Sequence, residues 1–128
     1  MYHRDWLMRQ IETITRYVFT LILGKGAELN SDLRLETRRP EGGDANPLSF
    51  RLAALVRAEQ LDRAENLLWA AVEENDPEAL PVGLRFYNEL NGLPDETLMR
   101  CGFPRDEILS GLKELCAAYG CDISVLGI

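Results

Sequence analysis

The clearest hydrophobic pattern of the chain lies in its first 23 residues. Apolar residues recur there at alternating spacings of four and three, and most positions between them are polar. They are Leu7, Ile11, Ile14, Val18 and Leu21. This spacing places the apolar side chains on one face of a helix. The pattern therefore predicts an amphipathic helix from about Arg4 to Leu23, which the glycines at 24 and 26 would end.

The hydrophobic periodicity weakens after this helix. Prolines and glycines crowd the stretch between Pro40 and Pro47, which predicts a linker over residues 27–47. Leu29 and Leu33 within it fit either a short helix or an extended segment, and the pattern leaves both open.

Residues 48–128 are expected to form a helical domain, and the N-terminal segment (residues 1–26) is expected to pack on it or on a second subunit. Short apolar periodicities alternate there with turn residues. The predicted helices are 48–60, 62–75, 80–91, 95–100 and 105–119. Asp62 and Glu65 are expected to form a capping box on the second of these. The apolar tail from Cys121 onward is expected to pack as an extended strap.

The amino-acid composition supports a helical fold. The chain has 128 residues, of which 21 are leucine and 11 alanine, against 16 valine, isoleucine and threonine residues together. Leucine and alanine favour helices, whereas β-branched residues favour strands. With 46% hydrophobic and 27% charged residues, the chain fits a globular domain and not a disordered one. We therefore predict an all-α fold of about five helices, arranged as antiparallel hairpins.

The net charge of −7 is divided unevenly along the chain. The first 40 residues carry a net charge of +2 and the remaining residues one of −9. A largely acidic body repels nucleic-acid phosphates, so a nucleic-acid partner is not expected. The one local basic cluster, formed by Arg34, Arg38 and Arg39, is interrupted by Glu36 and is assigned to a solvated surface.

Segments that would direct the chain to a membrane or out of the cell are not found. The longest uncharged apolar stretch, Tyr17–Leu23, has seven residues, whereas a membrane-spanning helix needs ~20. Asp5 and Glu12 precede this stretch and no small-residue cleavage site follows it, which argues against a signal peptide. The three cysteines are an odd number and lack C-x-x-C spacing, which favours a reducing compartment. We predict a cytoplasmic protein for which a membrane partner is not favoured.

The chain offers few side chains for catalysis or metal binding. Its single histidine, His3, lies near the chain end, where a general base lacks fixed positioning. A zinc site built from His3, Cys101, Cys116 and Cys121 would lack the close cysteine pair that structural zinc sites use. We therefore expect no catalytic residue, no metal ligand and no cofactor.

Two further motifs are assigned to structure. The glycines around Lys25 lack the spacing and the Lys-Ser/Thr pair of a phosphate-binding loop, so they are expected only to stop the first helix. Glu73, Glu74 and Asp76 are expected to be solvated acids at a helix end.

Residues 55–77 (LVRAEQLDRAENLLWAAVEENDP) resemble the central part of a tetratricopeptide repeat. The resemblance depends on the small Ala64, the large Leu68, the small Ala71 and the helix-ending Pro77. Pro77 lies six residues after Ala71 where the repeat has five, and Gly83 lies in a poor second copy. The resemblance implies one helical hairpin of this kind and no long solenoid.

A second resemblance covers nearly the whole chain. Four blocks of sequence carry it: DWLMRQIE (5–12), AENLLW (64–69), FYNELNGLPDETL (86–98) and FPRDEILSGLKELCAAYG (103–120). They resemble, in the same order, the blocks of a family of small uncharacterised proteins from anaerobic Gram-positive bacteria. Pro104 departs from the serine common in the family at that position. The resemblance implies a helical, repeat-like fold and supplies no catalytic residue, because the family's function is unknown.

The face of the first helix and two aromatic residues form the candidate interaction surface. It consists of Trp6, Leu7, Ile11, Ile14, Tyr17, Phe86 and Tyr87. The helix face could cover the helical domain of its own chain, pack on a second copy in an exchanged dimer, or lie on a membrane surface. The first placement is favoured. Of Phe86 and Tyr87, one is expected in the core and the other partly exposed.

These observations predict a protein–protein interaction or self-association module that acts on an unknown protein partner or as a homodimer. A small-molecule-binding regulatory domain, or a minor enzyme that uses the acidic helix ends, is the alternative. Converging polar groups in a pocket would favour the alternative.

Overall fold

A computed structural model describes residues 4–23 and 47–127 of the chain. These two ranges contain six α-helices, one short 3-10 helix and no strand, so the all-α prediction is confirmed, and each of the six ranges predicted as helical corresponds to one α-helix. The elements are α1 (Arg4–Leu23), α3 (Pro47–Arg57), α4 (Leu61–Glu73), α5 (Ala79–Asn91), α6 (Asp95–Cys101), α7 (Arg105–Ala118) and η1 (Ser124–Leu126). Several predictions from the sequence fall outside the described residues. They concern the linker up to residue 46 with its arginine cluster, the glycines after α1, and His3.

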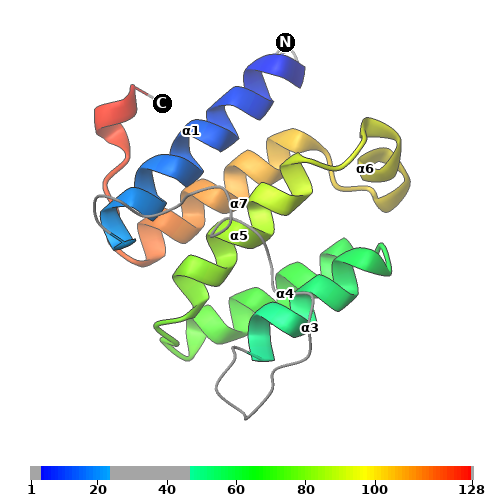
Figure 1. The fold of residues 1–128 in the computed structure, drawn as a ribbon, viewed down its shortest axis with the longest axis horizontal. Coiled ribbons are helices and arrows are strands. Elements are labelled where there is room, and N and C mark those ends of the chain that lie inside the picture. Colours follow the sequence, from blue (N-terminus) through cyan, green and yellow to red (C-terminus); the bar gives the residue numbers. More distant parts are fainter. Residues whose placement is uncertain (1–3, 24–46, 128) are drawn as a thin grey trace.

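Three helices form the centre of the fold. α1 packs on α5 and α7, α5 and α7 pack on each other, and the antiparallel α3–α4 hairpin packs against α5 (Figure 1). Since α1 covers both α5 and α7, the N-terminal helix belongs to the core in this arrangement of the chain.

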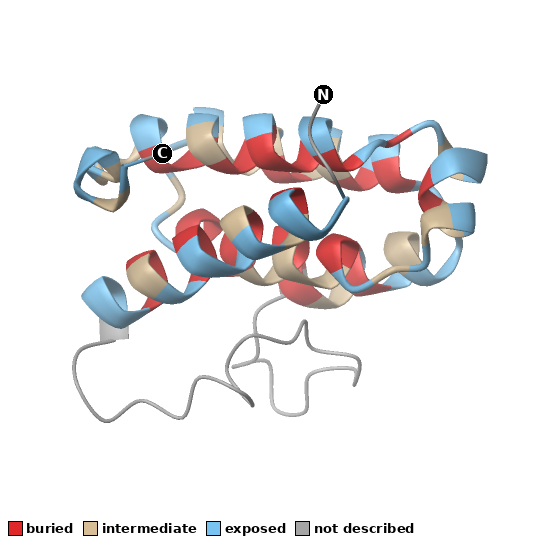
Figure 2. Ribbon diagram, turned by 90° about the horizontal axis from the view of Figure 1, so that it is seen from above, coloured by how far each residue is buried: buried red, intermediate tan, exposed pale blue. Residues whose placement is uncertain are grey.

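The apolar face predicted for α1 is the face that the structure buries. Ile11, Ile14, Val18 and Phe19 are completely buried, and Leu7 is nearly so. Figure 2 shows the buried parts of the helices turned toward one another and the exposed parts turned outward. The alternating spacing thus predicted the buried stripe correctly, except that Leu21 at its end is exposed.

Two glycines allow α5 and α7 to approach their neighbours closely. A Cβ atom on Gly83 of α5 would lie 2.5 Å from Leu115 Cδ2, and a Cβ atom on Gly111 of α7 would lie 2.5 Å from the Tyr87 hydroxyl. Real Cβ atoms do not approach other heavy atoms this closely, so any larger residue would push the helices or the side chains apart.

The start of α4 corrects one prediction from the sequence. The helix begins at Leu61 after the N-cap residue Gln60, and no side chain caps it. Asp62 therefore lies inside the first turn, and Glu65 accepts a hydrogen bond from Tyr87 on α5. The predicted capping box is wrong because a contact between helices uses the carboxylate that the box requires.

The C-terminal tail also differs from its prediction. Residues 124–126 form a 3-10 turn where an extended strap was expected. The Asp122 carboxylate accepts hydrogen bonds from both the backbone N–H and the hydroxyl of Ser124. Such local bonds favour a turn over extended backbone.

Within the two described ranges, no helix combines the length and the apolar character needed to cross a membrane.

Candidate functional site

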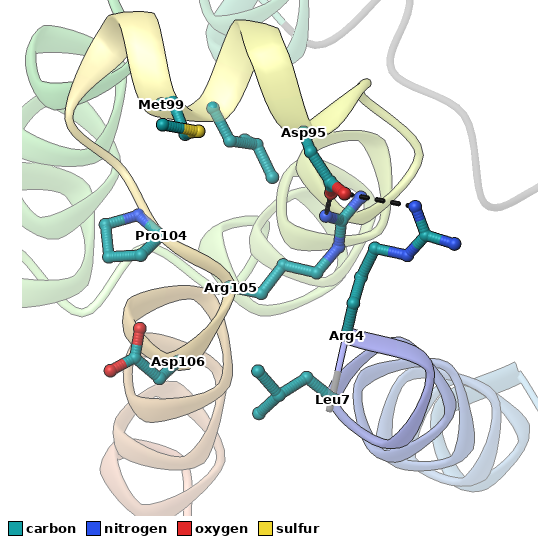
Figure 3. A pocket seen from close by; sticks show the side chains of 8 residues that line it. Arg4, Leu7, Asp95, Met99, Pro104, Arg105 and Asp106 are labelled. Carbon is teal, nitrogen blue, oxygen red and sulfur yellow. Dashed lines mark hydrogen bonds and ion pairs between the residues drawn. The ribbon is translucent and has the colours of Figure 1, made fainter. Parts of the chain in front are cut away.

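A groove opens where the start of α1, the helix α6 and the start of α7 meet. Its volume is about 330 Å³. The residues that line it are Arg4, Leu7, Asp95, Leu98, Met99, Pro104, Arg105 and Asp106 (Figure 3). Four of these side chains are apolar and four are charged, two of each sign.

The short helix α6 determines the shape of this groove. α6 ends at Gly102, whose φ of +66° is the left-handed conformation that favours glycine. The backbone N–H of Phe103 then donates to the carbonyl of Leu98 at 3.0 Å, and the Phe103 side chain is buried. The chain reverses at this point, so α6 lies beside the first turn of α7.

A buried guanidinium fixes the floor of the groove. The Arg105 side chain is only 7% exposed, and it pairs with the Asp95 carboxylate. It also donates to the backbone carbonyls of Asn91 and Leu93, at 3.0 and 2.8 Å. Arg105 therefore ties the connection between α5 and α6 to the start of α7. Its Nε atom is buried and has no acceptor.

The same carboxylate also holds α1. Arg4 donates to Asp95 at 3.0 Å, and both side chains are substantially exposed (Figure 3). The hydrogen bond from Arg4, with a further one from Arg105, holds the pKa of Asp95 below its usual value. Asp95 is therefore ionised at neutral pH and is not suited to act as a general acid. Close by, the Asn91 side-chain amide donates to the Met8 carbonyl at 3.1 Å, which links α1 to the end of α5.

Apart from Asp106, the rest of the groove is apolar. Leu7 and Leu98 are buried at its base, and Met99 is 82% exposed at its edge. Met99 was not singled out from the sequence, and no sequence signal marks it, because a methionine beside a leucine on a helix is equally compatible with a core position. Its exposure follows from the position of α6 at the edge of the fold (Figure 1).

The structure separates the seven residues predicted as an interaction surface. Leu7 lines the groove, Trp6 is 38% exposed, and Tyr17 is partly buried against the core. The other four are completely buried in this arrangement of the chain. They are Ile11, Ile14, Phe86 and Tyr87.

The physical reason for this burial is the packing of three helices. α5 and α7 cover the α1 face that carries Ile11 and Ile14. Phe86 and Tyr87 are neighbours whose ring centroids lie 5.0 Å apart, and both rings enter the core, where one had been expected to stay partly exposed. Tyr87 fits there because Gly111 has no side chain and because the tyrosine hydroxyl has hydrogen-bond partners.

The candidates for metal binding and acid–base chemistry stay apart. No group of three or more possible metal ligands occurs among the described residues. Cys116 is buried, and burial raises the pKa of its thiol to about 12, so the thiol is protonated at neutral pH. Glu73 and Glu74 are exposed at the end of α4.

Comparison with known proteins gives one match. The model of a family of unknown function (DUF6483) matches residues 1–120. The searches of curated proteins and of solved structures found no match.

Proposed function

Since the chain belongs to the DUF6483 family of unknown function, we propose a function from its own surfaces: it is a protein-interaction module that self-associates through the groove between α1, α6 and α7. The observation that carries the proposal is the exposure of Met99 at the edge of an apolar groove. Among the exposed large hydrophobic residues of the described ranges, Met99 has the highest exposed fraction. Flexible methionine side chains at an open apolar surface are typical of protein contacts.

The charges around the groove favour a second copy of the chain as the occupant. Arg4 and Asp106 carry opposite charges on the same groove. In a two-fold symmetric contact, each patch meets its own copy, so Arg4 of one copy can approach Asp106 of the other. The chain as a whole has a net charge of −7, which opposes association through most other surfaces, whereas the charges lining the groove balance.

The polar groups of the groove support an apolar occupant over a charged small molecule. The terminal nitrogens of Arg105 are engaged by Asp95 and by two backbone carbonyls. An anionic ligand would have to displace these partners at the cost of exposing buried polar atoms. A methionine side chain from a second copy needs no such displacement.

This proposal differs from the exchanged dimer considered from the sequence. An exchanged dimer requires α1 to leave α5 and α7, and to lose the burial of Ile11, Ile14 and Val18 until a second copy restores it. Association through the groove leaves the core of each copy intact.

Three further predictions from the sequence are part of this proposal. We propose tetratricopeptide-like packing for the α3–α4 hairpin, supported by the complete burial of Ala64 and Leu68, although Ala71 is only partly buried. We also propose a cytoplasmic location and an origin in anaerobic Gram-positive bacteria.

Sedimentation equilibrium of the full chain over a wide range of concentrations tests the self-association. We expect a reversible monomer–dimer equilibrium that Met99→Gln weakens by about tenfold or more in Kd, because a polar amide replaces the apolar side chain at the contact. Leu21→Gln is the matched control, since Leu21 is also an exposed apolar side chain but lies at the other end of α1. A wild-type chain that stays monomeric at its highest soluble concentration would overturn the proposal, as would equal weakening by both substitutions.

A further inference from the structure

A second polar cluster lies inside the fold, away from the groove. The Tyr87 hydroxyl on α5 donates to Glu65 Oε2 on α4 at 2.8 Å. It also accepts a hydrogen bond of 3.2 Å from the indole N–H of Trp69, one turn further along α4. Two bonds from α4 thus meet on one buried hydroxyl of α5.

The third helix of this cluster is α7. A Cβ atom on Gly111 would lie 2.5 Å from the Tyr87 hydroxyl and 2.9 Å from Glu65 Oε2. The backbone of α7 therefore closes over the hydrogen bond between Tyr87 and Glu65, and the Glu65 carboxylate is partly withdrawn from water at the place where α4 approaches α7.

Among the described residues, no cation compensates the Glu65 carboxylate within this cluster. The titratable groups that act on Glu65 are Asp62 on its own helix, Tyr87 on α5, and Glu107 and Glu114 on α7. Asp62, Glu107 and Glu114 are carboxylates, so the ionised form of Glu65 faces like charges. The neutral Tyr87 hydroxyl is the hydrogen-bond donor that stabilises it.

We propose that Glu65 is a proton-controlled clasp that holds the α3–α4 hairpin on α5 and α7, tight when its carboxyl group is protonated and looser when it is ionised. The protonated carboxyl still accepts from Tyr87 through its carbonyl oxygen, and it loses both the repulsion from the neighbouring acids and the cost of burying a charge. The clasp is independent of the groove, to which none of its residues belongs.

The sign of the pH dependence follows from burial. Desolvation, aided by the nearby acids and opposed by the Tyr87 hydrogen bond, raises the pKa of Glu65 above its ordinary value of 4.5. In the opened state the carboxyl is hydrated and its pKa returns toward that value. The clasp is therefore fully effective below pH 4.5, and its contribution is lost as the pH rises through the raised pKa of the closed state.

Linkage makes the test quantitative. Each unit by which the closed-state pKa exceeds the open-state pKa makes opening of the hairpin about tenfold more favourable above both values than below them. The carboxyl-carbon NMR titration of Glu65 measures its pKa in the closed state. Amide hydrogen exchange of α4, corrected for the intrinsic exchange rate at each pH, measures how readily the hairpin opens.

The experiment uses the full chain with Met99→Gln, so that self-association does not contribute. We expect Glu65 to titrate above its ordinary value of 4.5, and the opening constant to rise by the factor that the titration implies. Glu73, an exposed acid on the same helix, provides the control. Glu65→Gln, which keeps the acceptor for Tyr87, should remove this rise, whereas Glu73→Gln should keep it. Tyr87→Phe should raise the pKa of Glu65 further, because the ionised form then loses its donor.

Two results would overturn the clasp. One is a Glu65 titration at or below its ordinary value of 4.5, which needs no variant of the clasp itself. The other is a Glu65→Gln chain whose hairpin opening keeps the full pH dependence of the parent. Neither result bears on self-association through the groove, which Met99 and sedimentation test separately.

Discussion

Gly111 is the residue at which the interior depends most closely on side-chain size. The Tyr87 ring and the Glu65 carboxylate occupy the space that a Cβ atom would need. The Tyr87 ring cannot move away cheaply, because it is completely buried and its hydroxyl has two hydrogen-bond partners.

Gly111→Ala should therefore destabilise the chain by about 1–3 kcal/mol through overpacking, although alanine is the better helix former. Gly92→Ala is the control. A Cβ atom there would lie 3.6 Å from its nearest neighbour, the Glu89 carbonyl, and Gly92 has a helical φ of −84°. That substitution should be neutral or stabilise by about 0.4–1 kcal/mol. Urea unfolding of both variants measures the difference, and equal stability of the two would show that the close approach at Gly111 is not needed.

Sequence patterns predicted least about the roles of individual residues. The period of α1 predicted which side of the helix is buried, because that property is local. The role of Glu65 could not be read the same way, because the acid lies one turn into a helix and its partner Tyr87 is 22 residues away. The exposure of Met99 depends in turn on where α6 lies in the fold.

At the scale of elements, the α5–α6–α7 connection organises the groove. α6 has only seven residues and so contributes little stability of its own. Arg105 stabilises the short helix, because its side chain binds Asp95 at the start of α6 and two backbone carbonyls of the segment before it. The glycine after α6 and the start of α7 were predictable from the sequence, whereas the reach of Arg105 back across the turn depends on the packed arrangement.

Arg105→Met keeps most of the volume of the side chain but leaves the carbonyls of Asn91 and Leu93 without their donor. We expect a loss of about 2–4 kcal/mol in the free energy of unfolding, because a charged, buried hydrogen-bond donor is removed. Arg100→Met is the matched control: Arg100 pairs with Glu59 at the exposed surface of the same region, and its loss should change little. Thermal and urea unfolding measure both variants, and an Arg105→Met chain as stable as the control would contradict the role given to Arg105.

At the scale of the whole molecule, the packing of α1 determines whether the chain has one hydrophobic core or separate parts. The sequence suggested an N-terminal helix, a linker and a helical domain as three segments. In the structure α1 and the helices after residue 46 share one hydrophobic core, and Leu7 also contributes to the groove. The amphipathic period alone could not distinguish a helix that covers its own chain from one that covers a second copy, because both bury the same face.

The central claim is that α1 packs within its own chain and that copies meet through the groove. Isotope-filtered NOE spectroscopy on an equimolar mixture of labelled and unlabelled full chain tests both parts without any substitution. We predict intermolecular NOEs from the Met99 methyl group and its groove neighbours Leu7 and Pro104, and only intramolecular NOEs from the Ile11 and Ile14 methyl groups to α5 and α7. Intermolecular NOEs from Ile11 or Ile14 to α5 or α7, or their complete absence at Met99 in a sample that sediments as a dimer, would contradict the account.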